Sequence, residues 1–93
     1  MSKIKIGAIT YRIRMEHVDD AMARVIWKRS LIKVQKDMEK RITQETLLHE
    51  VMHIAFVQSG HDGKADEGLI DALAYTLLDS GLIDKKKLGR LLK

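Results

Sequence analysis

Two histidines four residues apart, His49 and His53, lie inside the longest helical pattern of the 93-residue chain. From about Met38 to Ser59, apolar residues recur at spacings of three and four, which predicts one amphipathic helix. These residues are Leu47, Leu48, Val51, Ile54 and Ala55. Side chains four residues apart project from the same face of a helix, about one turn apart. We therefore expect the two imidazoles side by side, where both can reach one ion.

The residues before this helix predict a small sheet. Apolar and charged residues alternate from Ile4 to Ile13, and Gly7 is expected to form a bend or a bulge within that strand. A less regular segment follows and suits a short helix or a loop. Val25–Trp27 and Leu31–Gln35 are then expected to pair as a hairpin. Asp37 is expected to cap the long helix at its N-terminus.

The residues after the long helix predict two further helices. Gly60 is expected to end the first helix and to open a loop that extends to Ala65. A second helix is expected from Asp66–Glu67 to Ser80–Gly81, and a short one from Lys85 to Leu92. Strands followed by helices indicate an α+β fold, here a small antiparallel sheet of about three strands packed against these helices. The length indicates a single domain spanning residues 1–93.

Composition limits the chemistry and the partners. The chain has no cysteine, so a metal ion would have to be held by His, Asp or Glu. The longest apolar run, Ile54–Val57, is far shorter than the roughly 18–20 residues of a membrane span, and we expect a cytoplasmic protein. The net charge is +4, which arises from 17 Lys and Arg residues against 13 Asp and Glu residues. The excess is mild and spread along the chain, so a solvated basic surface is the preferred interpretation, and the presence of only four aromatic residues argues further against nucleic acid as a partner.

The segment His49-Glu50-Val51-Met52-His53 has the His-Glu-x-x-His spacing that zinc hydrolases require on a helix. His49 and His53 are expected to bind Zn²⁺ through ring nitrogens. Glu50 is rotated by about 100° from His49 around the helix, so it is not expected to be a ligand. Its predicted role is that of general base, which takes a proton from a zinc-bound water and hands it to the leaving group.

A catalytic zinc site needs a third protein ligand and one open position. Glu67, at the start of the second helix, is the preferred candidate, and His61 is the alternative. Asp62 and Asp66 are more remote possibilities. Asp71, one turn after Glu67, is expected to accept a hydrogen bond from a zinc-binding histidine and so to orient it.

Three other polar residues are expected to have structural or surface roles. Tyr11 and Tyr75 could each supply a phenol to a transition-state oxyanion, but packing in the core is the preferred interpretation for both. His17 is isolated from the motif, and a surface position is expected for it.

Thr46–His53, followed by a short loop and by the segment from Glu67 to Ala74, resembles the minimal zincin metallopeptidases. The likeness is to small phage and prophage proteins and, more loosely, to the ImmA/IrrE-like peptidases. The resemblance implies that His49, His53 and Glu67 are the zinc ligands and that Glu50 is catalytic. It also implies that a strand beside the zinc helix pairs with an extended substrate, and Leu31–Gln35 is the candidate strand.

These observations lead to a zinc-dependent metallopeptidase that acts on a peptide or protein substrate. The alternative is a zinc-stabilised binding or accessory module, of a kind that a phage could encode, with weak or no hydrolytic activity. A third hypothesis is an accessory protein linked to nucleic acid that uses the positive charge.

Overall fold

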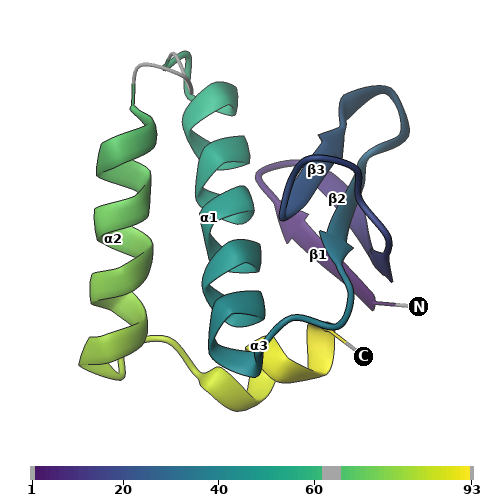
Figure 1. Cartoon of the computed structure of the whole chain (residues 1–93). Coiled ribbons are helices and arrows are strands. Elements are labelled where there is room, and N and C mark those ends of the chain that lie inside the picture. Colours follow the sequence, from purple (N-terminus) through teal and green to yellow (C-terminus); the bar gives the residue numbers. More distant parts are fainter. Residues whose placement is uncertain (1, 62–65, 93) are drawn as a thin grey trace.

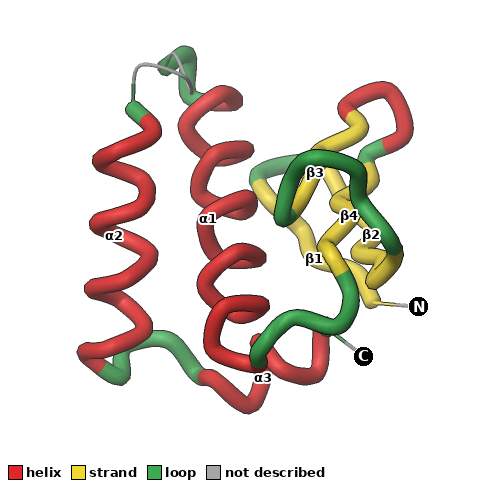
Figure 2. The backbone as a smooth tube through the Cα atoms, in the orientation of Figure 1, coloured by secondary structure: helices red, strands yellow, loops and turns green. Residues whose placement is uncertain are grey.

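The computed structural model describes residues 2–61 and 66–92. It is an α+β structure, as predicted, in which α1 lies between the sheet and α2, with α3 near one end of α1 (Figure 1). Figure 2 shows the α-helices segregated from the strands. In the described ranges no helix is long and apolar enough to cross a membrane. The elements are β1 (Ser2–Ile6), β2 (Ile9–Glu16), β3 (Ala23–Ile26), the 3-10 helix η1 (Trp27–Arg29), β4 (Leu31–Gln35), α1 (Lys40–Gln58), α2 (Glu67–Ser80) and α3 (Lys85–Leu91).

The sheet has four strands in the order β1-β2-β4-β3, so the prediction of about three antiparallel strands was wrong in detail. β1 and β2 form an antiparallel hairpin, and β3 pairs antiparallel with β4, but β2 and β4 are parallel. The parallel pair arises because β3, the next strand along the chain, does not pair with β2 but lies at the edge of the sheet, one strand away from it. The β3–β4 hairpin then brings β4 back between β2 and β3.

β4 is an interior strand, which corrects its predicted role as the substrate-pairing strand. Its backbone pairs with β2 on one side and with β3 on the other, so neither side is free for a further chain. Leu31, Ile32 and Val34 are fully buried, as is typical of a central strand. The edge strands, each with one unpaired side, are β1 and β3 (Ala23–Ile26), and both lie against α1.

Gly7 forms a hairpin turn and not a bulge, because Ile6 pairs directly with Ile9. Its φ is +62°, whereas Ala8 has an ordinary negative φ, the pattern of a type II′ turn with glycine at its first central position. The backbone of Gly7 also passes close to α1. A Cβ atom at this position would clash with the side-chain oxygen of Gln58, whose Nε2 donates to the hydroxyl of Tyr11 at 3.3 Å.

Gly7→Ala is expected to destabilise the protein by about 2–3 kcal/mol, from backbone strain and from displacement of the Gln58 amide. Urea unfolding followed by circular dichroism measures this change. The matched comparison is Gly60→Ala, since Gly60 also has a positive φ, +86°, but has open space around it. Equal losses in the two variants would contradict the proposed contact with Gln58.

Only one of the two ends of α1 was predicted correctly from the sequence. Asp37 is not the cap, because it lies in a turn with φ of +64° and the helix begins three residues later, after Glu39. Gly60 ends the helix as predicted. The amide of Gly60 donates to the carbonyl of Val57 at 3.1 Å, and the amide of His61 donates to that of Phe56 at 2.9 Å. This pair of bonds is a Schellman motif, which satisfies carbonyls that the helix leaves free.

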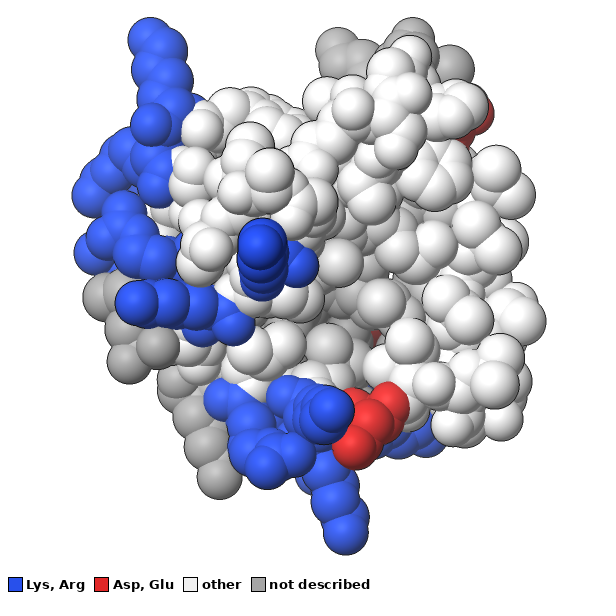
Figure 3. Space-filling model, turned by 180° about the vertical axis from the view of Figure 1, so that it is seen from behind, with Lys and Arg blue, Asp and Glu red and all other residues white. Residues whose placement is uncertain are grey.

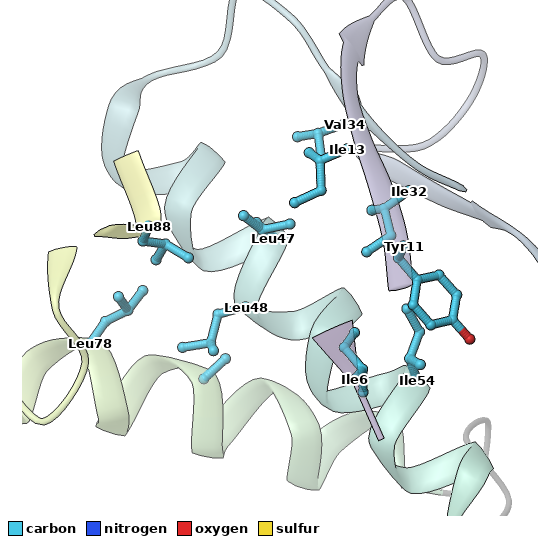
Figure 4. Packing of buried hydrophobic residues seen from close by; sticks show 11 residues of the cluster. Ile6, Tyr11, Ile13, Ile32, Val34, Leu47, Leu48, Ile54, Leu78 and Leu88 are labelled. Atoms are coloured by element: carbon cyan, nitrogen blue, oxygen red, sulfur yellow. The ribbon is translucent and has the colours of Figure 1, made fainter. Parts of the chain in front are cut away.

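α1 supplies apolar side chains to both of its neighbours. Leu47 points toward Ile13 and Val34 of the sheet, and Leu48 lies on the side of Leu78 from α2 (Figure 4). Leu47 and Leu78 are fully buried, and α3 closes this core with Leu88. Two sides of α1 therefore pack against the sheet and α2. A third side carries the histidine motif and is not part of this apolar packing.

Candidate metal centre

The motif residues lie on one turn of α1, midway along the helix. The rings of His49 and His53 have their centroids 6.2 Å apart, as expected for neighbours on one helical face. Their side chains are only 16% and 23% exposed. Both imidazoles are therefore largely shielded from water, and His49 also lines a pocket that a small ligand can enter.

Glu67 from α2 faces the same point as the two histidines. Its carboxylate oxygen Oε2 lies 3.0 Å from Nε2 of His49. One ligand atom from each of His49, His53 and Glu67 can be chosen so that all three lie within 4.8 Å of one another. Ligand atoms on a tetrahedral zinc at 2.0–2.1 Å are about 3.3 Å apart, so the three groups need only small movements to share one ion. Two imidazoles and one carboxylate form a common ligand set of catalytic zinc, and they leave one position open.

Asp71 lies beside the other nitrogen of His49. Its Oδ1 lies 2.6 Å from Nδ1 of His49, one turn along α2 from Glu67. A carboxylate at Nδ1 favours the tautomer with the proton on that nitrogen, and it leaves the lone pair of Nε2 directed at Glu67 and the metal position. α2 therefore contributes both a candidate ligand and the group that orients a ligand from α1.

Asp71→Ala is expected to weaken zinc binding roughly 10- to 100-fold, because His49 loses the group that fixes its tautomer and raises its basicity. Competition with a chromophoric zinc chelator measures the affinity. Asp79→Ala is the matched comparison, since Asp79 is an exposed carboxylate on the same helix that pairs with Arg41 at 2.9 Å. An unchanged zinc affinity in the Asp71 variant would contradict the role of Asp71 in orienting His49.

Glu50 is well placed to act beside the metal position without filling it. Its side chain is 14% exposed, and its Oε2 lies 4.0 Å from Nδ1 of His53. Burial raises the pKa of the Glu50 carboxyl above its ordinary value, and the nearby His49 and His53 oppose that shift. A pKa moved toward neutrality suits a group that accepts a proton and returns it.

A pocket of about 530 Å³ opens beside these residues between α1, α2 and the start of β3. Four of the residues that line this pocket were candidate site residues from the sequence: His49, Glu50, Glu67 and Asp71. The other five lining residues were not predicted from the sequence, and they are Met22, Ala23, Ile42, Glu45 and Thr46. Ile42, Glu45 and Thr46 could have been found, because they precede His49 on the same helical face at spacings of seven, four and three.

Trp27 was also missed, and it contacts the motif without lining this pocket. Its ring contacts the ring of His53 edge to face, with centroids 6.5 Å apart and an interplanar angle of 83°. Trp27 belongs to η1, the connection between β3 and β4, and it is 46% exposed. Nothing in the sequence predicts this contact, because it depends on how the hairpin packs against α1.

The other candidate ligands are not brought to this point. His61 follows the end of α1, with its ring 5.6 Å from that of Phe56, and it lines a separate pocket that also includes Asp66. Among the described residues, the group that can hold a metal contains neither of them. Asp62 lies outside the described residues. His17 is at the surface as expected, 2.8 Å from Asp19.

The two tyrosines differ from each other. Tyr11 is 2% exposed and packs in the core, as predicted. Tyr75 is 56% exposed, so the prediction that it packs in the core was wrong. It lies two turns beyond Glu67 on α2, where the guanidinium of Arg41 is 5.6 Å from its ring centre. A hydrogen bond with Asp79 raises the pKa of Tyr75. Tyr75 thus joins α2 to the start of α1 and does not line the metal centre.

Comparison with protein-family models, with curated proteins and with solved structures gives no match for this chain. The function is therefore argued from the geometry of the site.

Proposed function

We propose that this protein is a zinc-dependent metallopeptidase, with His49, His53 and Glu67 as zinc ligands and Glu50 as general base. The observation that carries the proposal is the position of Glu50. It is a largely buried carboxylate beside three converging ligands, and it lines an open pocket. A purely structural zinc site has four protein ligands and no use for such a group.

Zinc bound to this ligand set would activate water and polarise the peptide carbonyl. The protein residues perform the remaining tasks. Glu50 accepts the proton that the attacking water loses and transfers it to the departing amine. Asp71 keeps His49 in the tautomer that binds metal. The partly buried walls of the pocket limit the access of bulk water to the reacting groups.

β3 is the strand on which an extended substrate would bind. It lies at the edge of the sheet beside α1, and Ala23 at its start lines the pocket together with Met22. An exposed strand edge offers backbone donors and acceptors to a peptide in extended conformation. Met22 and Ile42 provide apolar surface for a substrate side chain next to the cleaved bond.

The first test is metal-dependent cleavage by the full chain. We expect the purified protein to bind close to one zinc ion and to cleave members of a diverse peptide mixture, with products identified by mass spectrometry. Removal of zinc with a chelator should abolish cleavage, and added zinc should restore it. Cleavage at an undiminished rate by metal-free protein would refute the proposal.

The same experiment separates the peptidase from the zinc-stabilised binding module. The module has one supporting observation, which is that the ligands join α1 to α2 and would tie the two helices together. If the module is correct, zinc raises the melting temperature but no peptide is cleaved.

A further inference from the structure

The face of the sheet that points away from α1 is strongly basic. Along each strand, Lys or Arg residues alternate with the residues of the core. The strands and η1 together contain eight of the chain's 17 basic residues but only one of its 13 acidic residues, Glu16. Figure 3 shows Lys and Arg along the sheet side of the molecule and at its lower end, while the opposite side, where α2 lies, is nearly free of charge in this view. The six basic residues of this face, here called the basic sheet face, are Lys3, Lys5, Arg12, Arg14, Arg24 and Lys33.

The register of the strands places these cations directly opposite one another. Lys33 of β4 lies between Arg14 of β2 and Arg24 of β3, and Lys3 of β1 lies opposite Arg12. Side chains in opposite positions are roughly 5 Å apart, so like charges there destabilise the sheet. Only Lys33 has an acidic partner within the strands, Glu16 at 3.1 Å. This repulsion between like charges is not needed for a face that is only exposed to water. A bound polyanion would neutralise the cations and relieve the repulsion.

We propose that the basic sheet face binds the phosphate backbone of double-stranded nucleic acid. Neighbouring strands about 4.8 Å apart present the cations as a grid, which suits contact with several phosphates. Tyr11, the one aromatic residue of the strands, is buried in the core, so the face has no platform for stacking single-stranded bases. The net charge of +4 understates this surface, because the acidic residues gather elsewhere.

The charge distribution also orients the partner. The pocket at the metal centre is lined by four acidic residues, Glu45, Glu50, Glu67 and Asp71, and by no Lys or Arg. A polyanion is therefore attracted to the sheet and repelled from the pocket. Five of the six cations lie on β1, β2 and β4, none of which lines the pocket, so nucleic acid can bind there without blocking it. This inference does not depend on the proposed peptidase activity.

The test is a titration of a fluorescently labelled 20-base-pair DNA duplex with the full chain, followed by anisotropy at several salt concentrations. Near 0.15 M salt we expect a Kd in the range of about 10⁻⁴–10⁻⁶ M, which falls as salt is lowered. In the double variant Lys3→Gln/Arg14→Gln, the slope of log K against log salt concentration should fall in magnitude by about two. Binding at 0.1 M salt should weaken roughly 10- to 60-fold. The matched variant, Lys86→Gln with Lys87→Gln on α3, has the same net charge and should bind nearly as tightly as the parent.

Three results would overturn the proposal. Equal losses in the two double variants would mean that overall charge, and not this face, is responsible. Tighter binding of single-stranded than of duplex DNA would exclude the assigned ligand. An acidic peptide that binds as tightly as the duplex, with the same dependence on Lys3 and Arg14, would make an acidic protein the partner. Circular dichroism verifies that each variant is folded, and His49→Ala should bind duplex normally even if the metal centre has been lost.

Discussion

Glu50→Gln is expected to lower kcat for peptide cleavage by about 10²–10⁴-fold while zinc remains bound. Glutamine has nearly the shape of glutamate but cannot accept the proton that the attacking water must lose. Zinc content should not change, because the three candidate ligands are His49, His53 and Glu67. Parallel measurements of zinc stoichiometry and of cleavage rate on the same protein preparation give both quantities.

Glu45→Gln is the matched variant for this prediction. Glu45 lies on the same helix and lines the same pocket, but it does not contact the histidines in the described structure. It should lose little activity, so a comparable loss in both variants would mean that the pocket needs negative charge in general. A rate close to the parent's in Glu50→Gln would remove Glu50 from the mechanism.

Glu67→Ala is expected to have the largest effect on metal binding, with zinc affinity lowered by at least about 100-fold. Peptide cleavage should be lost together with the zinc. The variant leaves two imidazoles on one helix, which is one protein ligand fewer than a catalytic zinc site requires. It also removes the contact at 3.0 Å that joins α2 to His49. Equilibrium competition with a zinc chelator measures the affinity, and circular dichroism verifies that α2 persists.

His61→Ala provides the contrast, because His61 was the other candidate from the sequence. It lies in the pocket near Phe56, away from the converging ligands, and zinc affinity should be unchanged. The reverse outcome, with zinc lost in His61→Ala and retained in Glu67→Ala, would assign the third ligand to His61.

The parts of the site that follow helical periodicity could be predicted. His49 and His53 had to lie on one face once the segment was recognised as a helix. Glu67 and Asp71 were selected in the same way, as residues one turn apart at the start of the next helix. The structure places them against opposite nitrogens of a single ring. Their roles in metal binding remain predictions.

The parts that depend on packing between distant segments could not be predicted in the same way. No residue of β4 specifies that β2 is its parallel partner, although the adjacent apolar pair Leu31-Ile32 was a sign of an interior strand. Asp37 has the right residue type for a helix cap, but the chain reaches α1 through a turn in which Asp37 adopts a positive φ. Tyr75 resembled a core residue, but it lies outside the buried stripe of α2, on the side where Arg41 contacts its ring.

The contact between Trp27 and His53 has a practical consequence. Trp27 is the only tryptophan of the chain, so all indole emission comes from a ring whose edge meets a candidate zinc ligand. Protonation of that imidazole, or its coordination by an ion, changes the surroundings of the chromophore directly. If an ion binds at this centre, rapid-mixing measurements of tryptophan fluorescence should follow its binding and release without any added label.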